Sequence, residues 1–153
     1  MRLTIELVPS TCWYTNVRSN VTTKEWDIIR KKCYANANNV CEICGDVGTK
    51  QGYKHNLECH EIWEYDEQNK IQKLIGLIAL CPNCHTTKHP GLAQMKNRMH
   101  IVEKQLQKIN NMSYAEVQIY LTSAFKLWEE RSKYNWTLNI DCIAEYMGDN
   151  LIQ

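Results

Sequence analysis

The sequence contains no apolar run that is long enough to cross a membrane. Its longest nearly apolar stretch is LIGLIALC at 74–81, whereas a membrane-spanning helix needs about 20 residues. It also shows no secretory signal, because Glu6 interrupts the short apolar segment in MRLTIELVPS. Internal repeats and low-complexity linkers are absent as well. We therefore expect a cytoplasmic protein without a membrane partner.

The chain also has almost no net charge. Its 18 Lys and Arg residues and 17 Asp and Glu residues give a formal charge of +1 at pH 7. A strongly basic protein attracts nucleic acid over its whole surface, and this protein lacks such a field. Any DNA contact must therefore depend on local cations, such as those at 30–32 and between 88 and 108. The alternative is that these cations are ordinary helix surface.

The first part of the chain has the patterns of one strand and one helix. LTIELV at 3–8 alternates apolar and polar residues, which predicts a short strand. Thr22 followed by Glu25 has the spacing of a capping box, which predicts a helix that begins near Thr22 or Thr23. This helix should fade in the Asn-rich NANN at 36–39.

The following segments predict a hairpin and then helices. LECHEIW at 57–63 and KLIGLIAL at 73–80 are strand candidates with a long connection. Pro82 suits the first turn of a helix. Apolar residues spaced three and four apart over 92–109 predict a strongly amphipathic helix, and a capping box at Ser113 begins its hairpin partner.

Together these patterns predict a single α+β domain over residues 1–153. We expect an N-terminal strand and helix at 1–39 and a zinc-containing core at 40–90. A helical hairpin and C-terminal arm should occupy 91–153, which makes the C-terminal half helical.

Eight cysteines stand in a chain without an export signal, where thiols are better interpreted as metal ligands or buried side chains than as disulfides. Two Cys-x-x-Cys pairs are formed by Cys41, Cys44, Cys81 and Cys84. Each pair presents two thiolates on one tight turn, and two turns complete a tetrahedral zinc shell. The two pairs are far apart in the sequence, and the inserted hairpin accounts for this if its ends meet. The sequence predicts structural Zn²⁺, and the alternative is four unrelated buried thiols.

A closed four-cysteine shell leaves His85 and His89 available for a second metal. Because they are four residues apart on a predicted helix, both imidazoles project from one face. His60, in the first strand candidate, can complete the minimum set for a metal-assisted hydrolase. Two alternatives remain: one of the helical histidines replaces Cys84 in the zinc shell, or both are surface residues.

The segments CEICG, LECHE and LIALCPNCHTTKH resemble the zinc-containing branch of the HNH endonucleases, over about residues 40–90. The resemblance implies a ββα-metal core and a nuclease that hydrolyses DNA phosphodiester bonds. It implies that His60 is the general base and that His85 and His89 bind a divalent ion on the scissile phosphate. Lys88, which lies between these two ligands, is a candidate phosphate contact.

Two positions depart from the family pattern. The residue before the base is usually Asp or His and ligates the metal, but here it is Cys59, whose thiolate favours zinc over magnesium. The middle Asn of HNH, which orients the base, is replaced by Gly76. If the site is active, we expect the second metal to be Mg²⁺, Mn²⁺, Ni²⁺ or Zn²⁺. The alternative to an enzyme is a catalytically degenerate HNH-like zinc module that binds nucleic acid or a protein partner, in phage defence or anti-defence.

An acidic run surrounds the candidate base. Residues 57–69 contain five Asp and Glu side chains and no Lys or Arg, which disfavours a phosphate there. One of these acids is alternatively a metal ligand, and Glu58 and Glu61 are the candidates. The remaining acids are interpreted as a solvated loop.

Overall fold

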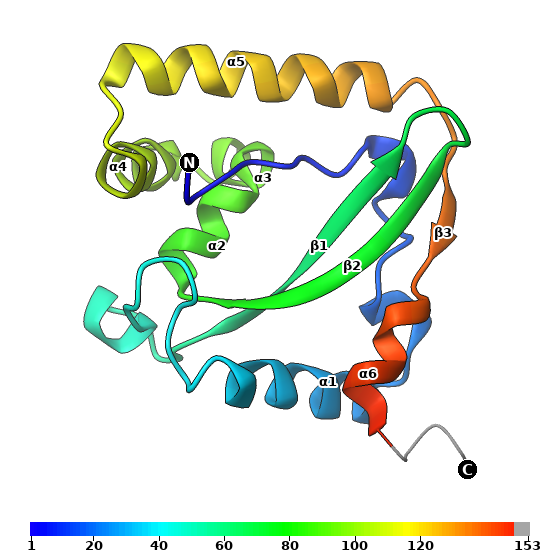
Figure 1. The fold of residues 1–153 in the computed structure, drawn as a ribbon. Helices are drawn as coiled ribbons and strands as arrows, with labels where there is room; N and C mark the ends of the chain where they lie inside the picture. Colours follow the sequence, from blue (N-terminus) through cyan, green and yellow to red (C-terminus); the bar gives the residue numbers. More distant parts are fainter. Residues whose placement is uncertain (149–153) are drawn as a thin grey trace.

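The structure is a computed structural model, and it describes residues 1–148. A long, twisted antiparallel hairpin runs through the middle of the molecule, with helices on both sides of it (Figure 1). Strand β1 (Glu58–Asp66) pairs with β2 (Ile71–Leu80), and β3 (Thr137–Asn139) adds a short parallel strand to β2. The expected α+β class is therefore confirmed for the described part of the chain.

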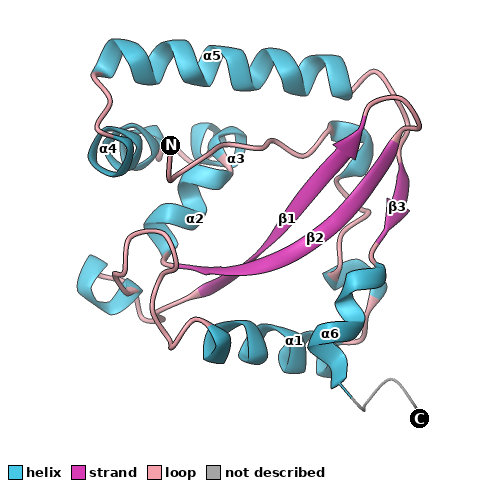
Figure 2. Cartoon of the chain, in the orientation of Figure 1, coloured by secondary structure: helices cyan, strands magenta, loops and turns pink. Residues whose placement is uncertain are grey.

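Helices lie on two sides of this sheet (Figure 2). On one side, α1 (Thr23–Asn36) packs against α6 (Ala144–Met147). The other side carries α2 (Pro82–Lys88), α3 (Pro90–Met95), α4 (Met99–Asn110) and α5 (Tyr114–Arg131). Short 3-10 turns occur at Ser10–Cys12, Arg18–Asn20, Gly48–Gln51 and Asp141–Ile143. Among the described residues, no helix is long and apolar enough to cross a membrane.

Capping begins the two long helices where the sequence predicts it. In α1 the Glu25 N–H donates to the Thr22 hydroxyl at 3.1 Å, and the Glu25 carboxylate accepts the Thr22 N–H. Ser113 and Glu116 form the same reciprocal pair at the start of α5. These contacts satisfy backbone donors that a helix leaves without partners at its first turn.

The segment at 3–8 is not a strand, contrary to the sequence expectation. Leu3 and Ile5 are buried, as the alternation predicts, but side chains bind their backbone N–H groups. The Leu3 N–H donates to Asn110 Oδ1 at 2.9 Å, and the Ile5 N–H donates to the Tyr120 hydroxyl at 2.8 Å. The alternating pattern reflects burial on one face. Side chains of α4 and α5, and not a neighbouring strand, accept the backbone hydrogen bonds of this segment.

The single amphipathic helix expected over 92–109 is two helices. It breaks between α3 and α4, where Asn97 adopts a left-handed conformation with φ of 54°. The apolar positions of α4 reach the core, since Val102 and Leu106 are fully buried. The apolar positions of α3 do not reach the core, because Leu92 and Met95 are exposed. The break turns the first two apolar positions of the pattern out of the core.

Candidate metal centres

Four cysteines meet where the hairpin ends and α2 begins. Cys41 and Cys44 come from the loop after α1, Cys81 follows β2 as the N-cap of α2, and Cys84 lies in α2. All four sulfurs lie within 4.8 Å of one another. The Sγ atoms of Cys44 and Cys81 are 3.6 Å apart. A disulfide requires about 2.05 Å, whereas two sulfur ligands at 2.3 Å from a tetrahedral zinc are roughly 3.8 Å apart. The cluster therefore fits a metal such as zinc.

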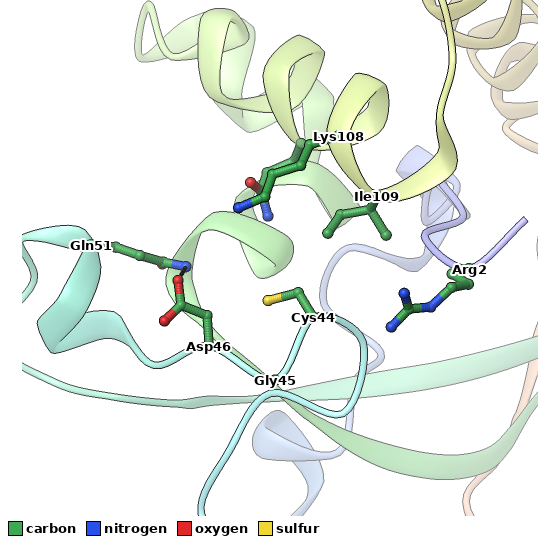
Figure 3. A pocket seen from close by; sticks show the side chains of 8 residues that line it. Arg2, Cys44, Gly45, Asp46, Gln51, Lys108 and Ile109 are labelled. Carbon is green, nitrogen blue, oxygen red and sulfur yellow. Dashed lines mark hydrogen bonds between the residues drawn. The ribbon is translucent and has the colours of Figure 1, made fainter.

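Neighbouring amides support negative charge on these sulfurs. Gln51 Nε2 donates to Cys81 Sγ at 3.2 Å, and the buried Gln105 donates to Cys84 Sγ at 3.3 Å. Cys44 is the least buried of the four cysteines and lines an open cavity of about 410 Å³ beside α4 (Figure 3). Such N–H···S contacts orient metal-binding thiolates and stabilise them.

The thiols alone do not all ionise. Hydrogen bonds from the Cys81 and Cys84 thiols lower the pKa of Cys41, whereas burial raises the pKa of Cys44 to about 12. Hydrogen bonding to Cys41 and Cys81 likewise raises the pKa of Cys84. A bound cation would remove the repulsion between neighbouring thiolates, because thiols that coordinate a metal lose their protons.

Three histidines form a second cluster on the neighbouring face of α2. His60 comes from β1, His85 from α2, and His89 ends α2, and their ligand nitrogens lie within 4.8 Å of one another. The Nε2 atoms of His85 and His89 are 3.2 Å apart. Two nitrogen ligands at 2.0–2.1 Å from a tetrahedral ion are roughly 3.4 Å apart. The pair of His85 and His89 therefore fits two ligands of one divalent ion, and His60 lies beside this pair.

Burial favours the neutral form of His60 and His89. His60 is only 7% exposed, and burial lowers its pKa well below the ordinary value, with a further contribution from His89 and His85. Burial also lowers the pKa of His89 to about 4. Neutral imidazoles keep the lone pair that a metal ion requires. The two side chains are therefore ready to bind a metal at neutral pH.

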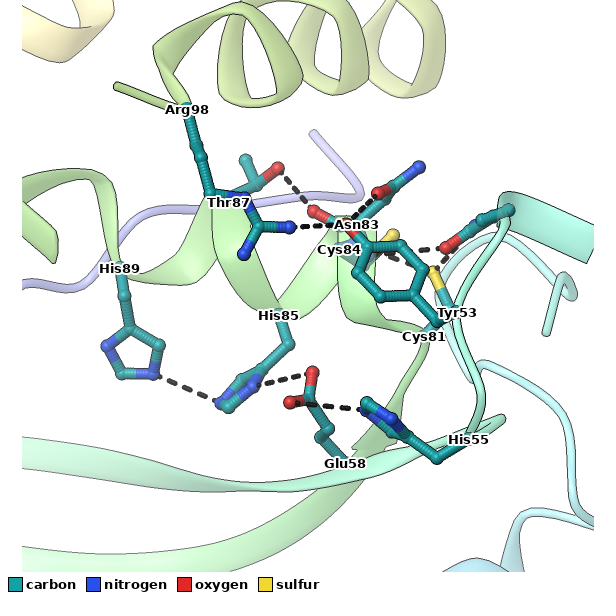
Figure 4. Close-up of polar contacts among 11 residues, drawn as sticks. Tyr53, His55, Glu58, Cys81, Asn83, Cys84, His85, Thr87, His89 and Arg98 are labelled. Carbon is teal, nitrogen blue, oxygen red and sulfur yellow. Dashed lines mark hydrogen bonds and ion pairs between the residues drawn. The ribbon is translucent and has the colours of Figure 1, made fainter. Parts of the chain in front are cut away.

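Glu58 orients one of the three histidines. Its Oε2 lies 3.2 Å from His85 Nδ1, and its Oε1 lies 3.5 Å from His55 Nε2 (Figure 4). Burial raises the pKa of Glu58, but His85 and His55 outweigh this effect and the pKa is lowered on balance. A carboxylate on Nδ1 leaves Nε2 of His85 directed at the metal position. The sequence could have indicated that Glu58 lies near the histidines, because Glu58 and His60 are two residues apart in a strand and therefore share a face.

Cys59 does not join the histidines, which corrects the sequence interpretation of this residue. It lies on the opposite face of β1, toward α1, where its thiol hydrogen-bonds Cys33. That hydrogen bond and burial raise the pKa of Cys59, so the thiolate form is disfavoured. The described metal-ligand group consists of the three histidines without Cys59.

The ammonium group of Lys88, the candidate phosphate contact, is bonded within the protein. Its side chain is buried, and Nζ lies 3.0 Å from both Thr4 Oγ1 and Glu6 Oε2. Lys88 thus anchors the N-terminal segment to α2. The cations that line the cavity at the histidines are Lys96 and Arg98, in a volume of about 160 Å³ shared with Glu58, His85 and His89.

Gly76, the position where the sequence resemblance expects an asparagine, stands in β2 opposite Ile62. A Cβ atom there would meet only the Tyr146 hydroxyl, at 3.9 Å, so space for a side chain exists. Glu58 supplies an orienting contact at the cluster, but it acts on His85 and not on His60.

Comparisons with known proteins leave the chain without an assigned family. No protein-family model matches it, no curated protein matches it, and no solved structure matches it. Function must therefore be inferred from the two clusters of metal-ligating side chains and their surroundings.

Proposed function

We propose that the protein is a metal-dependent, HNH-type endonuclease that hydrolyses DNA phosphodiester bonds. The observation that carries the proposal is the convergence of His60, His85 and His89 beside a cavity lined by Lys96 and Arg98. The order of elements agrees with a ββα-metal core, because β1 and β2 are followed directly by α2. The four-cysteine cluster joins the loop after α1 to the end of this hairpin, which suits a structural zinc.

His85 and His89 are the proposed ligands of the second divalent ion. When bound, such an ion polarises a phosphate oxygen and stabilises the charge of the transition state. Glu58 holds the His85 ring in place through Nδ1. His60 is the proposed general base: it is neutral at pH 7 and therefore able to accept a proton from the attacking water.

Arg98 and Lys96 are the proposed phosphate contacts. Arg98 hydrogen-bonds the Tyr53 hydroxyl, and its guanidinium carbon lies 5.7 Å from the centre of that ring (Figure 4). Because Tyr53 holds the guanidinium, less side-chain entropy is lost when a phosphate binds. These two cations supply a local positive charge that the overall composition does not.

Cleavage of plasmid DNA and of single-stranded DNA with added Mg²⁺, Mn²⁺, Ni²⁺ or Zn²⁺ tests the proposal. His60→Ala should lower the cleavage rate by at least 100-fold, as expected for loss of a general base. The same variant should retain the second metal, because His85 and His89, its proposed ligands, are unchanged. His100→Ala, at an exposed histidine of α4, is the matched control and should cleave normally. Metal-dependent cleavage that persists in His60→Ala would overturn the mechanism.

A second candidate function is a zinc-stabilised module that binds nucleic acid or a protein without turnover. The observations that favour it are the position of Cys59, which is directed away from the histidines, and the absence of a side chain at Gly76. This alternative predicts DNA binding that weakens with salt but no cleavage with any of the four ions. The cleavage assay above therefore separates the two functions.

A further inference from the structure

A second and larger cavity opens on the other side of His89. Its volume is about 680 Å³, and it lies between the N-terminal segment, the hairpin, α3 and α5. This is within the usual range of small-molecule sites, about 300–1,000 Å³. His89 lines both this cavity and the small cavity that contains Lys96 and Arg98. A ligand in the large cavity can therefore reach the histidine cluster.

Aromatic rings form part of the walls of the large cavity, together with apolar side chains such as Leu7 and Leu92. Trp13, Trp63 and Trp128 line it, and so does Phe125, the one phenylalanine of the chain. The indole N–H groups of Trp13 and Trp128 both donate to the Val8 carbonyl, at 3.3 Å and 3.0 Å. These bonds hold both rings by their polar edges. Trp13 stands at the rim with 57% of its surface exposed.

A few polar groups interrupt the aromatic walls. The Glu61 carboxylate lines the cavity and accepts the Val17 N–H at 2.9 Å through Oε1. Gln72 is almost fully buried there and already bonds Thr15 and Tyr65, whereas Asn16 lies at the edge. A purely apolar ligand would cover the Glu61 carboxylate without bonding it, which costs free energy. A flat ring that carries N–H donors and acceptors on its edge suits both the walls and the polar groups.

We infer that this cavity binds an unpaired nucleobase, belonging to a nucleotide next to the phosphate held at the histidine cluster. Aromatic walls with a few hydrogen-bonding side chains are how proteins hold bases that have left the stack. A base inside a regular duplex is stacked on both sides and does not enter such a cavity. The preferred substrate is therefore single-stranded or locally unpaired DNA. The identity of the attached phosphate rests on the function proposed above.

Binding without turnover tests the inference. Fluorescence anisotropy with the full zinc-loaded chain, and no other divalent ion, would compare three labelled DNAs of equal length: a single strand, its duplex, and the same strand with abasic sites. We expect the single strand to bind at least tenfold more tightly than the other two. Equal affinity for the normal and the abasic strand would overturn the inference.

A pair of neighbouring variants places the base in the cavity. Trp13→Ala removes a ring at the rim and should weaken binding of the single strand about tenfold, the usual effect of one lost base–aromatic stack. Tyr14→Ala is the matched control, because Tyr14 is 88% exposed on the same loop and does not line the cavity. Equal affinities of the two variants would show that the base binds elsewhere, and the inference would be wrong.

These results are independent of the endonuclease test. If binding depends on the base but no ion supports cleavage, the nucleobase site is supported and the endonuclease proposal is wrong. Cleavage of duplex and abasic DNA as fast as of a normal single strand would retain the endonuclease and reject the nucleobase site.

Discussion

The Nε2 atoms of His85 and His89 lie 3.2 Å apart, close to the separation of two nitrogen ligands of one ion. Helical spacing alone places the Cβ atoms of such residues about 5–6 Å apart and leaves their rings able to diverge. Here Glu58 holds the His85 ring from Nδ1, and burial fixes His89. The same separation suits an N–H···N hydrogen bond between the two rings, which a cation held by both Nε2 atoms would replace.

Removal of His89 should abolish the second metal site alone. We expect His89→Ala to reduce bound metal from two ions per chain to one, as measured by native mass spectrometry after dialysis against Zn²⁺. The four-cysteine site does not involve His89, so the remaining ion should stay. His100→Ala should keep both ions. A wild-type chain that binds a single ion would contradict the two-site interpretation.

Loss of one zinc-ligating cysteine should destabilise the whole domain. Cys41→Ser removes a ligand from a cluster that joins the loop after α1 to the end of β2, and structural zinc contributes directly to folding free energy. We expect loss of the cooperative thermal transition in circular dichroism. Cys142→Ser is the control, because Cys142 is remote from the cluster and its thiol donates to the Leu74 carbonyl, a bond that serine preserves.

The carboxylate that orients His85 should tune metal affinity without providing a ligand. Glu58→Gln keeps the size of the side chain but removes the charge beside His85 Nδ1. Outer-shell partners of this kind change metal affinity by about 10–100-fold. Isothermal titration with Zn²⁺ should show this loss, while Glu64→Gln, an exposed acid on the same strand, should leave affinity unchanged. An unaltered affinity in Glu58→Gln would mean that packing alone orients the ring.

Lys88 should contribute to stability rather than to DNA binding. Lys88→Ala breaks the contacts to Thr4 and Glu6 and releases the N-terminal segment from α2. We expect the free energy of unfolding to fall by about 2 kcal/mol, the usual contribution of hydrogen bonds to a charged group. The salt dependence of DNA binding should stay as in wild type, whereas Arg98→Ala should reduce its slope by about one charge. The reverse result would restore Lys88 as the phosphate contact.

Acid should destabilise the protein through His89 once the second metal is removed. The pKa of His89 is about 4 in the folded chain and 6.5 ordinarily, so between these values the unfolded chain binds a proton that the native chain does not. Stability is therefore complete above pH 6.5 and decreases toward pH 4. Linkage gives a loss of roughly 2 kcal/mol by pH 5 from this group.

Urea unfolding at pH 7.5 and pH 5 measures this effect. The decrease in stability between the two pH values should be smaller in His89→Gln than in wild type, because glutamine does not titrate. The difference between the two proteins isolates His89 from His60, whose pKa is lowered in the same direction. Equal decreases would show that His89 titrates normally in the folded chain.

Local patterns in the sequence determined the parts of this protein that depend on near neighbours. The capping boxes at Thr22 and Ser113 begin helices, and the two apolar segments around the acidic loop pair as β1 and β2. The Cys-x-x-Cys pairs converge, as their spacing predicts. In each case the interacting groups lie within a few residues, or a hairpin brings their ends together.

Tertiary structure alone decided the remaining features, because they depend on segments distant in the sequence. The segment at 3–8 has the alternation of a strand, yet Asn110 and Tyr120 take the hydrogen bonds that a neighbouring strand would need. Lys88 stands between two predicted ligands, but its ammonium group bonds Thr4 and Glu6 of the distant N-terminal segment. Each side chain bonds the nearest complementary group in space. The spacing of residues in the sequence reveals that group only when the two residues are also close along the chain.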